Sequence, residues 1–117
     1  MKENILKGKS YVFALKVIAL YKQIIIEHRE FVLSKQFLKS GTAPGALIRE
    51  AEFAQSKADF ISKMSIALKE ASECEYWMNL LKDSGHISQQ SFNELEASVK
   101  EIIYMLISSI KTAKSKN

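Results

Sequence analysis

The chain of 117 residues is long enough for one packed domain, and its 47% hydrophobic and 26% charged residues exclude general disorder. Four Gly and one Pro are too few for the many reversals of a sandwich or barrel, and the single cysteine excludes an internal disulfide framework. The net charge of +4 makes anionic partners plausible without requiring them. We therefore predict one all-α domain over residues 1–117, with short disordered tails at both ends.

The first predicted helix covers residues 10–27 and is apolar around most of its circumference. Its polar side chains gather on one narrow stripe, made by Lys9, Lys16, Gln23 and Glu27. A membrane span needs about 20 apolar residues, but Lys16 and Lys22 interrupt this segment. One small four-helix core cannot cover so many apolar side chains. We therefore expect this helix to lie between its own bundle and a neighbouring subunit.

The second predicted helix begins near Glu30 and meets helix-breaking residues in its middle. Pro44 removes a backbone hydrogen bond there, and Gly41 and Gly45 each disfavour the helix by up to about 1 kcal/mol relative to Ala. Residues 46–54 nevertheless resume a helical pattern, so we predict one long helix that is kinked near Pro44. Its expected seam consists of Phe31, Ser34, Leu38, Gly41, Gly45 and Ile48.

The third and fourth helices have the clearest patterns, because their apolar residues alternate at spacings of four and three. Ser56 and Asp59 form a capping box at the start of the third helix, and Gly85 is its expected stop. The fourth helix is expected to begin at Ser88 or Ser91. The two seams consist of Phe60, Met64, Ala67, Ala71, Cys74, Met78 and Leu81, and of Phe92, Leu95, Val99, Ile102, Leu106 and Ile110. Four helices with short connections predict an antiparallel up-down-up-down four-helix bundle.

No residue pattern in the chain points to catalysis or to a bound metal. Cys74 lies on the buried seam of the third helix, and neither histidine is on that helix to act as a base. His28 and His86 lie at helix ends, and few carboxylates stand near them at the spacing of a zinc site. Residues 41–45 lack the Gly-Lys-Ser/Thr sequence of a phosphate-binding loop. We therefore predict no enzymatic activity, no cofactor and no metal site.

Basic residues are concentrated toward the two ends of the sequence. Residues 1–40 contain eight bases and three acids, a balance of +5, whereas residues 41–81 have four bases and six acids. In an up-down bundle the first helix starts where the fourth helix ends, which predicts a lysine-rich end. Its lysines are Lys2, Lys7, Lys9, Lys111, Lys114 and Lys116. Such an end can bind a phosphate backbone, or it can consist of solvated termini that only aid solubility.

The ordered series of residues along the chain resembles one bacterial family. The residues that carry the resemblance are Glu50-Ala51, Ala54-Gln55-Ser56, Asp59-Phe60, Lys63-Met64, Ile66-Ala67, Lys69-Glu70-Ala71, Glu73, Tyr76-Trp77 and Leu80-Leu81, with Ser10-Tyr11, Phe13-Ala14 and residues 31–36 upstream. They are similar to the small four-helix-bundle proteins encoded in intervening sequences of 23S ribosomal RNA genes. Ala43 and Leu47 depart from the family's common Ser and Asn, so no role of those polar groups is carried over.

The resemblance implies an antiparallel four-helix fold that assembles as a ring, which is a homopentamer in known relatives. It also implies kinship with the accessory proteins of diversity-generating retroelements, basic pentamers that bind a reverse transcriptase and nucleic acid. The resemblance supplies no catalytic residues.

Two hypotheses about function remain open. The first is a cytoplasmic, non-enzymatic homo-oligomer, a pentameric ring, that binds RNA, DNA or a nucleic-acid enzyme such as a reverse transcriptase through its lysine-rich end. The second is a structural or protein-interaction oligomer with no nucleic-acid partner. Neither hypothesis involves a membrane. In both, the residues expected at the oligomer interface are Leu15, Ile25, Gly41, Gly45 and Trp77.

Overall fold

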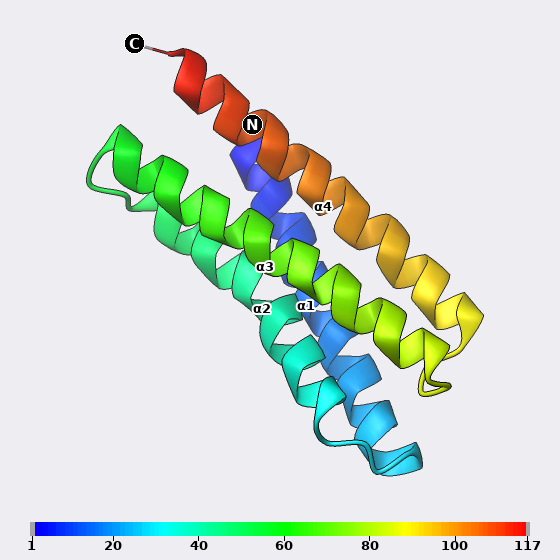
Figure 1. Cartoon of the computed structure of the whole chain (residues 1–117). Coiled ribbons are helices and arrows are strands. Elements are labelled where there is room, and N and C mark those ends of the chain that lie inside the picture. Colours follow the sequence, from blue (N-terminus) through cyan, green and yellow to red (C-terminus); the bar gives the residue numbers. More distant parts are fainter. Residues whose placement is uncertain (1, 117) are drawn as a thin grey trace.

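The computed structural model in Figure 1 describes residues 2–116, and the side chains of residues 4–116. Its four helices are α1 (Lys2–Glu27), α2 (Leu33–Glu52), α3 (Lys57–Asp83) and α4 (Gln89–Ser115). The helix pairs in contact are α1–α2, α2–α3, α3–α4 and α1–α4, and the described residues form no diagonal pair. This arrangement is the adjacent-helix packing of an up-down four-helix bundle, about 50 Å long and 20 Å wide.

The helices extend further toward both ends of the chain than the sequence predicts. α1 begins at Lys2 rather than near Ser10, and α4 continues to Ser115. Residues 2–9 and 111–115, at the two ends where short disordered tails are predicted, are helical. Leu6 explains the first extension, because its side chain is fully buried in the core and holds this part of α1 against the bundle.

Side chains at the turns account for the start of three helices. The Ser56 hydroxyl accepts a hydrogen bond from the backbone N–H of Asp59, 3.0 Å away, which confirms the predicted cap of α3. The Ser88 hydroxyl caps α4 in the same way, through the N–H of Ser91 at 3.1 Å. α2 is capped from outside by Glu30, whose carboxylate accepts hydrogen bonds from the N–H groups of residues 32–34 at 2.7–3.0 Å. Gly85, with φ of +82°, ends α3 as predicted.

α2 continues through Pro44, as predicted, and contacts α1 closely at one glycine. A Cβ added to Gly41 would lie 2.7 Å from both γ-methyl groups of Val17. Gly41 is buried there, so the absence of a side chain allows α1 and α2 to approach each other. Pro44 is also fully buried on the core side of this helix.

The core is formed by one face of each helix. All the predicted seam residues of α3 and α4 are buried, except that Phe60 is half-buried. The seam predicted for α2 is found in part, because Ser34, Gly41 and Ile48 are buried. Phe37 and Pro44 are buried in place of their neighbours Leu38 and Gly45, which are half-buried. Phe31 precedes this helix and is 57% exposed, so it does not belong to the seam. The α1 side chains in the core are Leu6, Phe13, Val17, Leu20 and Ile24.

Candidate functional site

α1 carries a second stripe of residues that faces away from the core, which we call the outer face of α1. Its residues are spaced by four, three, four, four, three and four: Asn4, Gly8, Tyr11, Leu15, Ala19, Lys22 and Ile26. Three of the large side chains are well exposed, with Tyr11 at 60%, Leu15 at 51% and Ile26 at 76%. A row of this spacing is the pattern by which one helix packs on another. Within the described chain no helix covers it.

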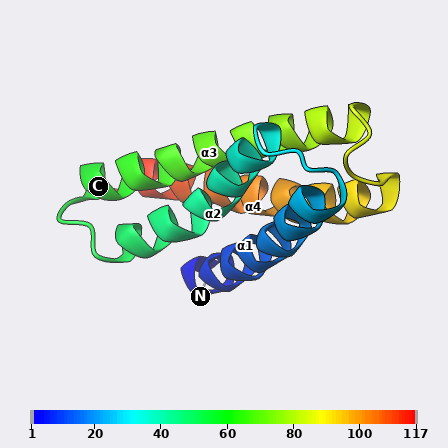
Figure 2. The same cartoon turned by 90° about the horizontal axis from the view of Figure 1, so that it is seen from below.

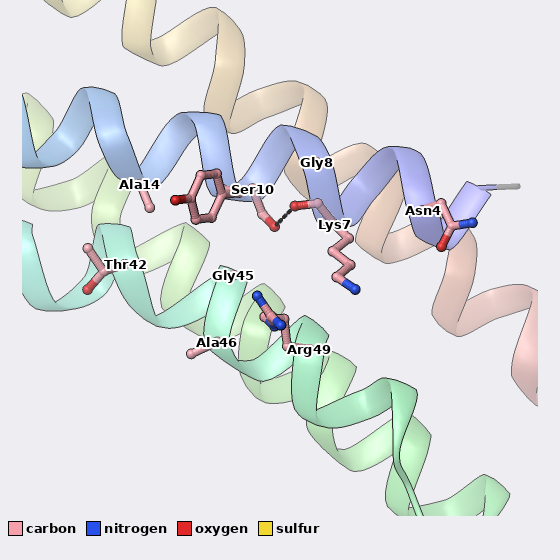
Figure 3. A pocket seen from close by; sticks show the side chains of 10 residues that line it. Asn4, Lys7, Gly8, Ser10, Ala14, Thr42, Gly45, Ala46 and Arg49 are labelled. Carbon is pink, nitrogen blue, oxygen red and sulfur yellow. Dashed lines mark hydrogen bonds between the residues drawn. The ribbon is translucent and has the colours of Figure 1, made fainter.

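A groove between α1 and α2 continues the outer face of α1 (Figure 3). It has a volume of about 550 Å³, and three of its lining residues, Asn4, Gly8 and Tyr11, belong to the outer face. No atom lies within 4 Å of the Cβ position of Gly8, so this part of the groove is open space. Lys7 and Arg49 extend into the space between the two helices. The groove and the outer face of α1 therefore form one continuous surface.

The structure brings some of the predicted interface residues to this surface. Leu15 is on the outer face of α1, and Gly45 lines the groove. Ile25 is half-buried on the same helix. Gly41 lies inside the subunit against Val17, so it is not available to a second subunit. Trp77 is half-buried on α3, and its ring contacts that of Tyr76 edge-on at 5.1 Å.

Lysines gather where α3 begins and α4 ends, which we call the basic end. The Lys57 ammonium donates a hydrogen bond to the backbone carbonyl of Lys116, and this contact places the two helix ends side by side. Lys111 and Lys114 are exposed on the last turns of α4 and form no ion pair with a described residue. Lys57 is not among the lysines predicted at this end from the sequence, although the up-down topology brings the start of the third helix here.

The six lysines predicted at one end do not form one cluster. The Lys7 ammonium pairs with the Glu52 carboxylate at 2.9 Å, and the Lys9 ammonium pairs with the Glu101 carboxylate at 3.1 Å. α4 continues from Glu101 to Ser115, about 20 Å further at 1.5 Å per residue. Figures 1 and 2 accordingly place the start of α1 short of the tip of the bundle. The side chain of Lys2 lies outside the described residues.

A hollow that we call the end pocket opens beside the basic end, among the start of α1, the end of α2 and the start of α3. Its volume is about 750 Å³. The large apolar side chains that line it are Ile48, Phe60 and Met64. Polar groups in the lining come from Lys7, Lys57 and Ser56. The Lys7 ammonium forms an ion pair with the Glu52 carboxylate, which also lines the pocket. The end pocket thus combines an apolar lining with cationic groups, as small-molecule and nucleotide sites often do.

Comparison with known proteins places this architecture in a family. The profile of the family described as 23S rRNA-intervening sequence protein matches residues 2–108. The chain belongs to this family. It is also similar to a crystal structure described as a protein of unknown function from the S23 ribosomal protein family of Bacteroides thetaiotaomicron. The two share 51% sequence identity and a TM-score of 0.93 over 95% of this chain and 99% of that chain. No curated protein gives a significant match.

Membership in the 23S rRNA-intervening sequence protein family confirms the predicted resemblance and agrees with the all-α fold. The two departures from the family pattern lie on the second helix. Leu47 is half-buried and packs against the core, so its side chain contributes apolar contact where the family commonly has Asn. Ala43 is half-buried as well.

The cysteine and the two histidines lie apart from the outer face of α1 and from the basic end. Burial raises the pKa of the Cys74 thiol to about 12, so the thiol stays protonated inside the core. The His28 and His86 rings meet edge-on at 5.4 Å. They lie on the turns that follow α1 and α3, and Figure 1 shows these turns at the far end of the bundle from the basic end. The part of the chain that the structure describes holds no group of three His, Cys, Asp or Glu side chains suited to a metal. None of its helices is long and apolar enough to span a bilayer.

Proposed function

We propose that this chain forms a non-enzymatic homo-oligomeric ring in which the outer face of α1 packs against a neighbouring subunit. The observation that carries this proposal is the exposure of Tyr11, Leu15 and Ile26 in a helical row. Monomeric proteins rarely expose contiguous apolar patches of this kind, whereas interfaces between subunits use them. Five subunits follow from the family resemblance, and the exposed row supports self-association.

A ring requires that the outer face of α1 meet a different surface of the next subunit, because a self-complementary contact closes as a pair. α4 offers such a surface. Tyr104 is 75% exposed and Ile107 is 47% exposed, one turn further along the same side of the helix. We assign this ridge as the partner of the outer face of α1.

Light scattering coupled to size exclusion tests the assembly. We expect a mass of five times the 13.3 kDa of the chain, independent of concentration in the micromolar range. Tyr104→Glu should reduce the mass, because the charge would be buried in the interface. Tyr76→Glu is the matched control, because Tyr76 is also exposed but lies on α3. A monomeric wild-type chain would refute the proposal.

The basic end of the ring supports a second part of the proposal, which is binding to nucleic acid or to an enzyme that acts on nucleic acid. Lys111 and Lys114 are exposed and unpaired with any described carboxylate, and Lys57 and Lys116 lie beside each other. In a ring each subunit repeats this group of lysines. The repeated positive charge would follow a phosphate backbone without sequence preference.

A titration of structured RNA across salt concentrations tests this part. The apparent affinity should fall steeply between 50 and 200 mM salt, since binding releases counterions. Changing Lys111 and Lys114 to Glu should abolish binding. Lys35→Glu with Lys39→Glu is the matched control, because these exposed lysines of α2 carry the same charge away from the basic end. Absence of binding by the wild type at 50 mM salt would overturn it.

One observation favours the alternative, an oligomer that has a structural or protein-binding role and no nucleic-acid partner. Lys7 and Lys9, two of the six predicted lysines, are neutralised by Glu52 and Glu101. Under this alternative, changing Lys111 and Lys114 to Glu leaves assembly and partner binding unchanged, and RNA does not bind at any salt concentration.

A further inference from the structure

Phe53 is the most exposed large apolar side chain in the part of the chain that the structure describes, at 80%. It lies on the turn between α2 and α3, next to the basic end. Its backbone is held in place, because its N–H donates to the carbonyl of Glu50 at 3.1 Å, and the following N–H donates to that of Ala51 at 3.2 Å. The aromatic ring therefore projects from a fixed turn into solvent.

The neighbours of Phe53 along the chain are mostly polar, unlike the residues of the outer face of α1. Glu52 and Gln55, on either side of the turn, are exposed, and so is Lys57. A subunit interface would need a contiguous apolar patch here, and an isolated ring within polar groups does not supply one. An isolated, exposed aromatic ring next to a basic surface is instead the arrangement on which proteins stack the bases of single strands.

The end pocket lies next to this ring along the chain. Glu52 and Ala54, the two neighbours of Phe53, both line it. Its volume of about 750 Å³ is within the range of pockets that hold nucleotide-sized ligands. Phe60 and Met64 offer apolar contact to the faces of a base, while Lys57 offers a cation to a phosphate.

Lysines near the end pocket can contact the phosphates of a bound strand. Lys57 lines the end pocket and also donates to the carbonyl of Lys116, so the end of α4 adjoins the rim of the pocket. Lys114 is exposed within the last turn of the same helix. Glu52, the carboxylate that lines the pocket, is paired with Lys7 and repels phosphate less than a free carboxylate would.

We propose that the basic end binds single-stranded nucleic acid, with one base stacked on Phe53 and a neighbouring base in the end pocket. This inference rests on the proposed binding of nucleic acid at the basic end and specifies the strandedness of the ligand. In a duplex the bases are stacked on each other and their faces are closed to an aromatic side chain, whereas unpaired bases are open to it. Phosphates of the bound strand contact Lys57, Lys114 and Lys116.

Fluorescence anisotropy with two probes of equal length tests the proposal: a labelled oligouridine and a perfect RNA duplex. The wild type should bind the single strand more tightly than the duplex. Phe53→Ala should weaken single-strand binding about tenfold or more and leave the salt slope unchanged, because a stacking contact releases no counterions. Lys114→Gln should lower the salt slope by about one, since it removes one phosphate contact.

Phe31→Ala is the matched control, because Phe31 is 57% exposed on the turn between α1 and α2, at the opposite end of the bundle. It should bind both probes as the wild type does. If Phe53→Ala and Phe31→Ala bind the single strand equally well, the stacking site is refuted while binding at the basic end stands. If neither probe binds the wild type at 50 mM salt, the proposed function itself fails.

Light scattering on Phe53→Ala separates stacking from assembly. The variant should keep the mass of the wild type, because Phe53 is outside the proposed subunit interface. A reduced mass would assign Phe53 to a contact between subunits and overturn the inference.

Discussion

The two sides of α1 are both apolar but have different surroundings. On the inner side Val17 is fully buried, in contact with the glycine position of α2. On the outer side Leu15, two residues earlier, is 51% exposed, and no helix of the described chain covers it. α1 therefore encodes two separate associations, one within the subunit and one proposed between subunits. Total hydrophobicity alone does not distinguish them.

The largest effect is expected from placing the same charge on each side of α1. Val17→Glu should unfold the subunit, because an unpaired carboxylate in the core costs more than about 4 kcal/mol, a large part of the stability of a small domain. Leu15→Glu should leave the helical circular dichroism signal intact and reduce the mass, because the carboxylate lies in water until subunits associate. Circular dichroism and light scattering on both variants measure the difference.

Lys16→Glu controls for the change of charge, since Lys16 is exposed and lies outside the outer face of α1. It should affect neither signal. Equal unfolding by Val17→Glu and Leu15→Glu would show that the outer face is part of the core after all. A Leu15→Glu chain with the mass of the wild type would remove this face from the interface.

One glycine at each side of α1 allows a smaller change than a charge: Gly41 contacts the inner side, and Gly8 lies on the outer face. Gly41→Ala should lower the free energy of unfolding by about 1–2 kcal/mol, because the clash with the Val17 methyl groups exceeds the gain in helix propensity. Gly8→Ala should raise it by up to about 1 kcal/mol, because its Cβ meets no atom within 4 Å. Urea unfolding in the Leu15→Glu background measures both without a contribution from assembly.

The double variant Gly41→Ala with Val17→Ala checks the cause of the first effect. Removing the γ-methyl groups should relieve the clash, so the two substitutions should be less destabilising together than the sum of their separate effects. If the changes in the free energy of unfolding are strictly additive, the loss of stability in Gly41→Ala does not come from its contact with Val17.

The sequence predicted the fold best where apolar spacing was regular. The seams of α3 and α4, the cap at Ser56 and the stop at Gly85 are all found in the structure. The seam of α2 was predicted only in part, because Gly and Ser dominate that face and such small residues give a weak hydrophobic pattern. Glu30 was not predicted as a cap, since a carboxylate two or more residues before a helix has no simple sequence signature.

The candidate site was predicted less completely, because it depends on pairings between helices. Spacing along α1 indicated surplus apolar surface but could not show which side is covered, as Leu15 and Val17 illustrate. Similarly, the count of lysines could not show that Lys9 meets a carboxylate of α4. Phe53 was not predicted as a site residue, because a single Phe before a helix cap carries no functional pattern in the sequence. Its 80% exposure in the structure distinguishes it.

The smallest effect on stability is expected at the turn that joins α1 to α2. This turn helps to hold the inner side of α1 against α2 and has no part in the proposed subunit interface. Partial burial of the Glu30 carboxylate acts to raise its pKa, but hydrogen bonds from the N–H groups of residues 33, 34 and 32, with the charge of His86, lower the pKa below 4.5. A lowered folded-state pKa stabilises the fold above the unfolded value, and this contribution disappears as the pH falls through the folded value. Glu30→Ala should therefore lower the free energy of unfolding by about 1 kcal/mol at pH 7, as for loss of a helix cap.

The pH dependence distinguishes this effect from a simple loss of contact. The difference between wild type and Glu30→Ala should be present at pH 7 and at pH 6, and should shrink as the pH is lowered below 4.5. Glu73→Ala is the control, because Glu73 is exposed and forms no ion pair with a described residue; it should change stability little at either pH. Both variants should keep the mass of the wild type, because the cap acts within the subunit. A Glu30→Ala chain of reduced mass would couple the inner side of α1 to assembly and contradict the separation of its two sides.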